Sequence, residues 1–324
     1  MVDSPIMRQE RVANFSFGPP RGIAAKVVLA VLAAGVVLTA CRLASAETLP
    51  PPAKASLPAI TSPAQSATPT VHLATPKPSP TPTCLEQRGL TEKITYRGAV
   101  VEGDVPVWVF LPPCYAQGDQ RYPVLVGLHG YPYDESHWAD LGLLAAAESG
   151  MVAGELPPMI IVLPRQPEPL YRGTSGGARS YEEELLEGLL PFVDSTFRTE
   201  ARPESRTLAG ISRGGVWSLE IGLRHPEVFG SVAGLSPALS LNAARGGMYD
   251  PLVIAQRADE LPARIYLMAG QDDWARDSTE ELDGFLRSRG ASLVLDIRPG
   301  GHADATWQPV MADVLRFAAA GGSS

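Results

Sequence analysis

The sequence is short of the residues on which several classes of protein depend. Its 27 lysines and arginines are outnumbered by 35 aspartates and glutamates, and the net charge of −8 leaves no basic surface to neutralise the phosphates of a nucleic acid. It contains no Cys-x-x-Cys pair, no His-x-x-x-His pair and no glycine motif of the kind that cradles phosphate. We therefore expect no nucleic-acid partner, no metal ion and no organic cofactor.

No apolar run is long enough to span a bilayer comfortably. The longest, VVLAVLAAGVVLTA, covers Val27 to Ala40, follows a polar segment with basic residues, and suits the core of a secretory signal. It ends in Leu-Thr-Ala-Cys, which resembles the bacterial lipobox, where the signal is cut before a cysteine that receives lipid. We expect residues 1–40 to be a lipoprotein-type signal peptide and Cys41 to anchor an exported protein to the cell membrane. An ordinary signal peptide or a single anchor helix is the alternative.

Large apolar side chains are almost missing from the segment that follows. Ten prolines fall between Glu47 and Thr83, among alanine, serine and threonine. Such a segment cannot bury enough surface to offset the entropy lost on ordering. We therefore expect residues 41–83 to be a disordered linker rich in proline, threonine and serine. Residues 84–324 are long enough for one sizeable core and are expected to form a single domain.

Cysteine is scarce, and of the three in the chain only Cys84 and Cys114 fall within the expected domain. Export would place them in an oxidising compartment. There they predict a disulfide that ties the first residue of the domain to the end of an early strand. Two buried thiols are the alternative.

Within the domain, apolar stretches alternate with segments of helical periodicity. Repeated alternation of this kind predicts a mostly parallel α/β sheet with helices on both faces. In such sheets the functional residues lie in loops at the carboxyl ends of the strands. The expected strands are 105–112, 122–130, 158–164, 206–210, 230–236, 264–270 and 292–299, and the expected helices begin at Ser180 with a capping box, at 214, at about 278 and before 319.

The pattern Gly-x-Ser-x-Gly occurs twice, at 173–177 and at 210–214. A nucleophilic serine of this type needs a strand leading directly into it and a helix directly after it, with glycines that let the two approach closely. Ser212 has both, since SRTLA precedes it and GVWSLEIGLRHP follows. Ser175 has neither, because turn-forming residues separate it from the preceding strand. The sequence predicts Ser212 as the nucleophile and Ser175 as part of a flexible glycine-rich loop.

Histidine is also scarce, so the base that Ser212 requires can be sought by elimination. Four of the five histidines lie elsewhere. His72 lies in the linker, and His129 and His137 lie at and after the end of an early strand. His225 lies at a helix end, where it is expected to cap carbonyls. His302 follows the last strand. The chain order serine, acid, histidine of α/β-hydrolases therefore predicts His302 as the base.

The acid should lie between the two, after the strand at 264–270. The segment QDDWARD offers Asp272, Asp273 and Asp277. Its carboxylate would accept the second imidazole N–H and stabilise the imidazolium, and only one of the three can do so. Adjacent side chains diverge, so one of Asp272 and Asp273 is expected to bond backbone amides, while Asp277 lies near a helix start. The residues alone leave the choice open.

Charge that develops on an attacked carbonyl needs fixed N–H donors. The backbone N–H of Arg213, directly after the nucleophile, is predicted to be one. The other is predicted in the loop after LVGLHG, at Tyr131. The alternative is that this His-Gly turn is loop geometry without a catalytic role.

From about Cys84 to Ala319 the chain resembles the esterase D-like family of α/β-hydrolases, which includes feruloyl esterases, S-formylglutathione hydrolases, enterochelin esterases and mycolyltransferases. The resemblance is carried by YPVLVGLHGY at 122–131, ELLEGLLPFVDSTFRT at 184–199, LAGISRGG at 208–215 and GGHADATW at 300–307. It implies an α/β-hydrolase fold and places the acid at Asp273, since the acid of feruloyl-esterase-like relatives ends a short turn that corresponds to GQDD here. The chain departs from many relatives by lacking Gly-Gly after the His-Gly pair and by having Arg213 where they have methionine.

These observations predict an exported, lipid-anchored serine esterase that needs no cofactor. It would hydrolyse a carboxylic ester, of feruloyl, acetyl or another small acyl type, through an acyl-enzyme. The substrate would be a small-molecule or glycan-linked ester. The alternatives are an acyltransferase on the same triad and a non-catalytic lipoprotein that binds a surface glycan.

Overall fold

The computed structural model of the protein describes residues 85–321. The predictions made for residues 1–84 therefore fall outside the described residues, namely the signal peptide, the lipid on Cys41, the linker and the Cys84 half of the disulfide. Across residues 85–321, no helix combines the length and apolar character that crossing a membrane requires.

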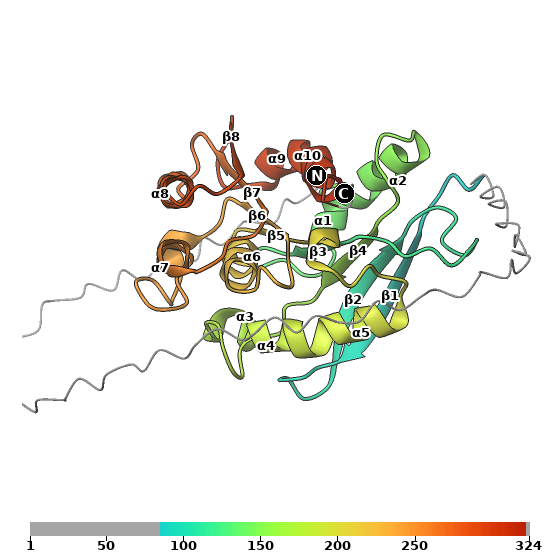
Figure 1. Ribbon diagram of the computed structural model, residues 1–324, viewed down its shortest axis with the longest axis horizontal. Helices are drawn as coiled ribbons and strands as arrows, with labels where there is room; N and C mark the ends of the chain where they lie inside the picture. The colour runs from blue at the N-terminus through green and yellow to red at the C-terminus, as the bar shows by residue number, and fades with distance from the viewer. Residues whose placement is uncertain (1–84, 322–324) are drawn as a thin grey trace, which may run out of the picture. The chain divides into compact units, whose positions relative to one another are not determined.

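One eight-stranded sheet organises the described residues, in the order β1-β2-β4-β3-β5-β6-β7-β8 (Figure 1). β1 pairs antiparallel with β2, and β2 with β4, whereas all other neighbours are parallel. The predicted mostly parallel α/β sheet is confirmed. The strands are β1 (Leu90–Arg97), β2 (Asp104–Leu111), β3 (Val124–Leu128), β4 (Ile160–Pro164), β5 (Arg206–Ile211), β6 (Ser231–Leu235), β7 (Arg264–Gly270) and β8 (Leu293–Arg298).

The burial of the strands explains why most of them can be predicted from the sequence and β1 cannot. Every residue of β3, β4, β5 and β6 is buried, as expected for central strands covered on both faces, and apart from Arg206 at the start of β5 their residues are apolar or small. β1 was not among the strands expected from such runs. It lies at the edge of the sheet, its sequence LTEKITYR mixes polar and apolar residues, and within it only Tyr96 is fully buried.

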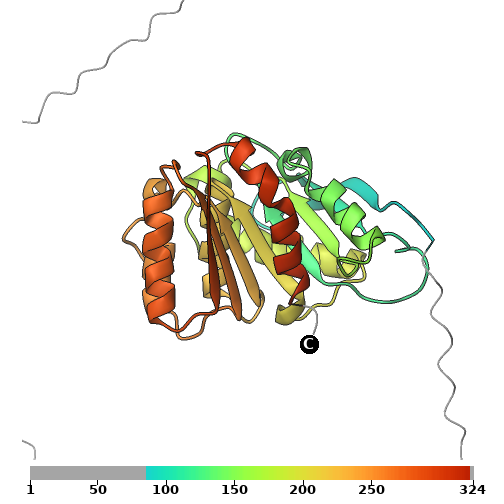
Figure 2. The same ribbon diagram turned by 90° about the horizontal axis from the view of Figure 1, so that it is seen from above.

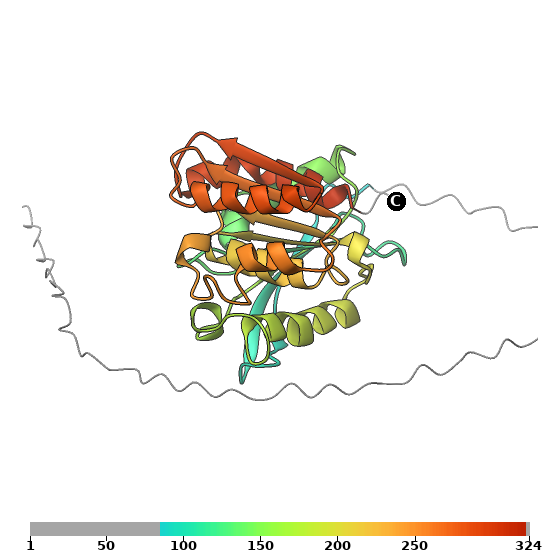
Figure 3. The ribbon, with the colours of Figure 1, turned by 60° about the vertical axis from the view of Figure 1, so that its left-hand side comes forward.

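Helices cover both faces of the sheet and form a separate core on each (Figures 2 and 3). Figure 2 shows α10 and α2 over one face, and Figure 3 shows the helices of the other face side by side. The first face carries α1 (His137–Asp140), α2 (Leu143–Val152) and α10 (Met311–Ala319). The second carries α5 (Leu190–Thr196), α6 (Arg213–Arg224), α7 (Pro251–Arg257) and α8 (Arg276–Ser288).

The helix expected after Ser180 is present but changes character along its length. Ser180 Oγ accepts the Glu182 N–H at 3.1 Å, while the Glu183 carboxylate accepts the N–H of Arg179, so only half of the predicted capping box forms. Pro191 has no N–H to donate, and the turns just before it are π-helical. The segments are α4 (Tyr181–Glu183), a π-helix (Glu184–Leu189) and then α5.

The carboxyl ends of the parallel strands meet at one edge of the sheet. β3 ends before His129, β5 before Ser212, β6 before Ser236, and β7 and β8 run into the loops that carry Asp273 and His302. Segments far apart in the chain are brought together there by the sheet order. The remaining short elements are α3 (Leu170–Gly173), α9 (Asp304–Trp307) and 3-10 turns at Pro203–Ser205, Leu239–Leu241 and Gln308–Val310.

Candidate active site

Ser212 is the single residue between β5 and α6, and its backbone is strained. Its φ of 54° lies in the left-handed region that side-chain-bearing residues avoid. The flanking glycines make this turn possible. A Cβ on Gly210 would lie 2.0 Å from the Gly214 carbonyl oxygen, and one on Gly214 would lie 2.4 Å from the Leu128 carbonyl oxygen. The strand-turn-helix geometry predicted at 210–214 is therefore present, with a physical need for both glycines.

Ser212, His302 and Asp273 form one line of hydrogen bonds. The Ser212 hydroxyl donates to His302 Nε2 at 2.8 Å, and His302 Nδ1–H donates to Asp273 Oδ1 at 2.9 Å. The imidazole lies between two tryptophan rings, Trp274 at 4.2 Å and Trp307 edge-on at 5.0 Å. Packing on both sides fixes the ring in the orientation that these two hydrogen bonds require.

The choice among the three aspartates is decided by burial and direction. Asp273 is 5% exposed, and its Oδ1 accepts the Ala275 N–H at 2.8 Å as well as the His302 N–H. Asp272 and Asp277 are both exposed. Burial by itself would raise the pKa of Asp273, but hydrogen bonding from His302, Ser236 and the Ala275 amide outweighs it and holds the pKa below its ordinary value. The carboxylate beside His302 is therefore charged at neutral pH.

Ser236 supports this carboxylate from the end of β6. Its backbone is also in the left-handed region, with φ 45°, and its Oγ accepts the Trp307 Nε1–H at 2.9 Å. The Asp273 Oδ2 is buried and has no hydrogen bond of ordinary geometry within residues 85–321. The Ser236 hydroxyl contributes to lowering the pKa of Asp273. Ser236 thus links the ring that packs on His302 to the acid that orients it, a role that the sequence did not signal.

The two backbone amides predicted as oxyanion donors follow the carboxyl ends of the neighbouring strands β3 and β5. Within the described residues, neither the Arg213 N–H nor the Tyr131 N–H donates a backbone hydrogen bond. A Cβ on Gly130 would lie 3.4 Å from Ser212 Cβ, so the turn that leads into Tyr131 is packed against the serine. Their role as oxyanion donors, which charge stabilisation at an attacked carbonyl requires, stays a prediction.

Two buried histidines hold the turn that carries Tyr131. His129 Nδ1–H donates to the Gly130 carbonyl at 3.0 Å and its Nε2 accepts the Gln166 N–H at 3.0 Å, which requires a neutral ring. Burial lowers the pKa of His129 to about 4, consistent with that state. His137 Nδ1 accepts the Gly130 N–H at 3.3 Å while its Nε2–H donates to Asp304. The ring nitrogens of these two histidines are used to position the backbone and Asp304, and neither ring hydrogen-bonds to Ser212.

A pocket of about 350 Å³ opens above Ser212 and His302. Trp274 and Tyr131 line this pocket, and 47% and 51% of their surfaces, respectively, are exposed. Aromatic faces that remain in contact with solvent are suited to stacking on a ring or a sugar. The remaining lining residues are Arg172, Arg213, Ala238, Leu241 and Ala243.

Comparison with known proteins identifies the family. The model of the family described as "Putative esterase" matches residues 98–318. The chain belongs to this esterase family.

Two curated relatives of the chain are much longer than the stretch that matches. An endo-1,4-beta-xylanase/feruloyl esterase of Xylanibacter ruminicola is 33% identical over 130 residues, which cover 38% of this chain and 18% of the relative. An esterase of Mycobacterium tuberculosis is 30% identical over 137 residues, which cover 41% of this chain and 29% of the relative. The chain therefore matches less than a third of the length of either protein.

Solved structures share the fold of this chain. A ferulic acid esterase superimposes with a TM-score of 0.65 at 24% identity, covering 72% of this chain and 99% of that one. The S-formylglutathione hydrolase of Staphylococcus aureus gives 0.63 at 17% identity, covering 72% and 99%. A ferulic acid esterase of Anaeromyces mucronatus, solved with ferulic acid, gives 0.58 at 23% identity, covering 71% and 89%. At these identities the likeness establishes the α/β-hydrolase fold.

The other Gly-x-Ser-x-Gly stretch, at 173–177, touches the pocket residue Arg213 through the Thr174 carbonyl but does not bring its serine to the pocket. It follows the short α3, and Ser175 is not among the pocket residues. Its backbone is anchored rather than free, since the Gly176 N–H donates to the Glu220 carboxylate and the Gly177 N–H donates to Glu182 Oε2 at 2.8 Å. The expected loop is present, but these contacts argue against the flexibility predicted for it.

The structure also locates His225 and Cys114, for which the sequence predicted a capping role and a disulfide. His225 does not cap carbonyls, because its ring nitrogens pair with Glu182 at 2.7 Å and Glu227 at 2.9 Å. Cys114 is buried three residues after the end of β2, and its predicted partner Cys84 falls outside the described residues, so the disulfide stays a prediction. Within residues 85–321, no three His, Cys, Asp or Glu side chains are grouped so as to hold a metal ion.

Proposed function

We propose that this member of the esterase family is a serine hydrolase that cleaves a carboxylic ester through an acyl-enzyme. The observation that carries the proposal is the hydrogen-bonded line from Asp273 through His302 to Ser212, which opens into a pocket. A serine hydroxyl is a weak nucleophile until an oriented imidazole removes its proton. The arrangement supplies both the imidazole and the carboxylate that orients it.

In the first half of the reaction, Ser212 Oγ attacks the ester carbonyl carbon while its proton moves to His302 Nε2. The carbonyl oxygen becomes an oxyanion that accepts hydrogen bonds from the backbone N–H groups of Arg213 and Tyr131. The C–O bond to the alcohol then breaks, and His302 returns the proton to the departing alkoxide. In the second half, water gives a proton to His302 and attacks the acyl-enzyme, and the released serine oxygen recovers that proton.

The substrate is proposed to be a feruloyl, acetyl or other small acyl ester, free or linked to a glycan. Two observations support this range. The pocket presents exposed Trp274 and Tyr131 faces beside the nucleophile. One relative of the same fold is solved with ferulic acid bound, and another is named for both xylanase and feruloyl esterase activity.

We further propose that the protein is exported and held at the membrane by lipid on Cys41, with a proline-rich linker between the anchor and the domain. The apolar run that ends in Leu-Thr-Ala-Cys supports this location. A Cys84 to Cys114 bridge would fit the same oxidising environment.

The test is covalent labelling of the full chain with a fluorophosphonate, combined with hydrolysis of 4-nitrophenyl esters, methyl ferulate and acetylated xylan. Labelling at Ser212 and hydrolysis of at least one ester class are expected. A chain that neither reacts with the probe nor cleaves any ester would overturn the proposal in favour of a binding protein. Ester products formed from an added alcohol, in place of free acid, would instead identify an acyltransferase.

A further inference from the structure

The pocket above Ser212 is lined by two arginines and by no acid. Arg172 and Arg213 are its charged lining residues, apart from the ionisable His302. The whole chain carries a net charge of −8, so an acid-free cavity with two guanidinium groups differs from the rest of the protein. An excess of positive charge in a cleft attracts ligands of the opposite sign.

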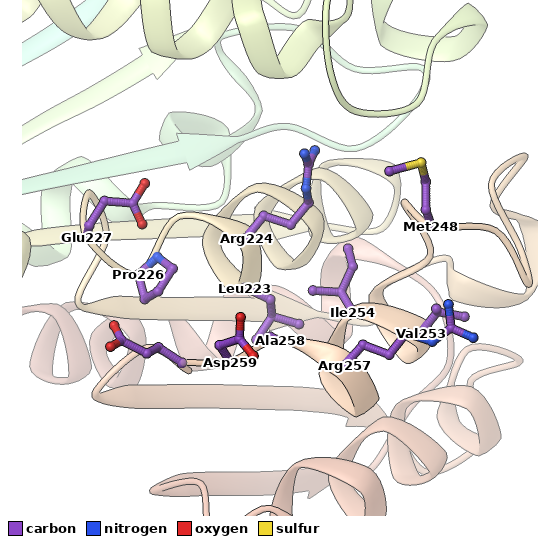
Figure 4. A pocket seen from close by; sticks show the side chains of 11 residues that line it. Leu223, Arg224, Pro226, Glu227, Met248, Val253, Ile254, Arg257, Ala258 and Asp259 are labelled. Atoms are coloured by element: carbon purple, nitrogen blue, oxygen red, sulfur yellow. The ribbon is translucent and has the colours of Figure 1, made fainter. Parts of the chain in front are cut away.

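Another cavity, of about 450 Å³, shows how arginines are otherwise placed (Figure 4). Arg224 and Arg257 line it together with the acids Glu227, Asp259 and Glu260. Arg224 also pairs with the Glu182 carboxylate. In that cavity, charges of both signs are present and need no ligand to balance them.

The Arg213 guanidinium has only neutral partners. Its Nε–H donates to the Tyr171 carbonyl at 3.0 Å, one Nη1–H to Asn242 Oδ1 at 3.3 Å and one Nη2–H to the Thr174 carbonyl at 3.2 Å. A guanidinium has five N–H groups, so one on each terminal nitrogen is left over. No carboxylate of the described chain comes within ion-pair distance of it.

The nearest acid along α6 does not supply the missing charge. Glu220 lies seven residues after Arg213, and burial raises its pKa to about 8, so at neutral pH it is mostly uncharged. Glu168 is paired with the neighbouring Arg172 at 2.7 Å instead. Burial lowers the pKa of Arg213 itself, but a guanidinium remains protonated near neutral pH. A partly desolvated cation without a counter-ion is costly, and an anion that binds beside it recovers that cost.

We propose that the pocket is specific for esters that carry a carboxylate or an equivalent anion, and that Arg213 binds this anion through its two unused terminal N–H groups. The inference rests on the proposed esterase function and adds a substrate class to it. Arg172, whose charge is balanced by Glu168, lines the same pocket and is held over the Tyr131 ring at 4.7 Å, so the anion-binding role falls on Arg213. Planar, paired N–H groups on Arg213 suit the two oxygens of a carboxylate.

The experiment uses two pairs of rigid aromatic esters, which differ only by a para carboxylate or carboxamide. Monomethyl terephthalate and methyl 4-carbamoylbenzoate place the anion on the acyl side. Acetoxybenzoate and acetoxybenzamide, both substituted at the 4 position, place it on the alcohol side. Each kcat/KM is divided by the rate of alkaline hydrolysis of the same ester, which removes differences in intrinsic reactivity.

The wild-type chain is expected to favour the anionic member of one pair by about tenfold or more, since a charge-assisted hydrogen bond contributes that order of discrimination. Which pair shows the preference identifies the side of the ester that carries the anion. Arg213→Gln should bring the ratio close to one, and Arg213→Lys should keep part of it. Arg276→Gln, which removes an arginine of α8 that does not line the pocket, should leave the ratio unchanged.

A measurement on the wild type alone keeps the test valid if Arg213→Gln does not fold. Raising the ionic strength should raise KM for the anionic ester and leave KM for its neutral partner unchanged. Equal use of both members in each pair, or a preference that survives Arg213→Gln, would overturn the inference while leaving the esterase function intact. Failure to hydrolyse any of the four esters, together with no fluorophosphonate labelling, would overturn the function itself.

Discussion

The Ser212 hydroxyl lies 2.8 Å from His302 Nε2, although 90 residues separate the two in the chain. β5 and β8 deliver them to the same edge of the sheet from strands that are not neighbours. Asp273 orients the His302 ring for this contact, because its carboxylate oxygen lies 2.9 Å from His302 Nδ1.

Ser212→Ala should lower kcat/KM for ester hydrolysis by several orders of magnitude, on the order of 10⁵- to 10⁶-fold, because both halves of the reaction pass through this oxygen. The matched control is Ser175→Ala, in the other Gly-x-Ser-x-Gly stretch, which should change turnover little. Steady-state kinetics on a 4-nitrophenyl ester would compare them. A large loss in the Ser175 variant with retention in the Ser212 variant would reverse the assignment.

Asp273→Asn should reduce kcat by roughly 10³- to 10⁴-fold, because the amide favours the imidazole tautomer that cannot take the serine proton. Asp272→Asn is the neighbouring control, and its exposed side chain predicts nearly full activity. Both variants should fold, which circular dichroism can establish. Equal losses in the two variants would mean that the turn, and not the carboxylate on His302, is what matters.

Ser236→Ala should lower kcat by about tenfold with little change in KM, because the loss of the hydroxyl affects the orientation of His302 and Asp273 and not substrate binding. The substitution removes the acceptor of Trp307 Nε1–H and one of the groups that lower the pKa of Asp273. Ser236→Gly separates the hydroxyl from the backbone, since glycine suits a φ of 45°. If glycine restored kcat, strain and not the hydroxyl would be the cause.

Glu220→Gln should make the protein less sensitive to rising pH. The folded-state pKa of Glu220 is raised from 4.5 to about 8, so below 4.5 the carboxyl is protonated in both states and costs nothing. Between 4.5 and 8 the unfolded chain ionises first, and stability falls as the pH rises, with the full penalty present above 8. Glutamine keeps an acceptor for the Gly176 N–H but cannot ionise.

The measurement for Glu220→Gln is the free energy of unfolding in urea at pH 5 and at pH 8. The variant should gain on the wild type between these values by on the order of a few kcal/mol at most. Glu155→Gln, at an exposed position, serves as the control and should show no such gain. A variant that lost ground at pH 8 would show that Glu220 is charged in the folded protein.

Cys41→Ser should release the protein from the membrane fraction or leave the precursor uncleaved, if lipid on this cysteine is the anchor. Fractionation of the producing cells, with the mass of the mature chain, would show either result. Ester hydrolysis by the released protein should match the wild type, because the proposed active site lies far along the chain in residues 131–302. Unchanged membrane association would refute the lipid anchor.

Local sequence was enough to predict most of the central strands and the turn at Ser212. β7 begins and ends where its apolar run does, and α6 begins one residue before its expected start. Strand periodicity and a glycine-flanked turn are short-range properties, encoded within a few residues of each other. β1 could not be predicted in this way because it is an edge strand with only one fully buried residue and therefore has no apolar run. Its stability comes from pairing with β2.

The sequence by itself determined the fold class, the candidate serine and the candidate base, since the alternation of strands and helices and the scarcity of histidine left few choices. The tertiary structure decided the rest. It selected Asp273 over Asp272 by the direction of the side chain, buried Glu220 so that desolvation raises its pKa, and left Arg213 among neutral oxygens at the pocket. These properties depend on which distant side chains converge, and that is set by the strand order and the packing of loops from several strands, not by any local pattern.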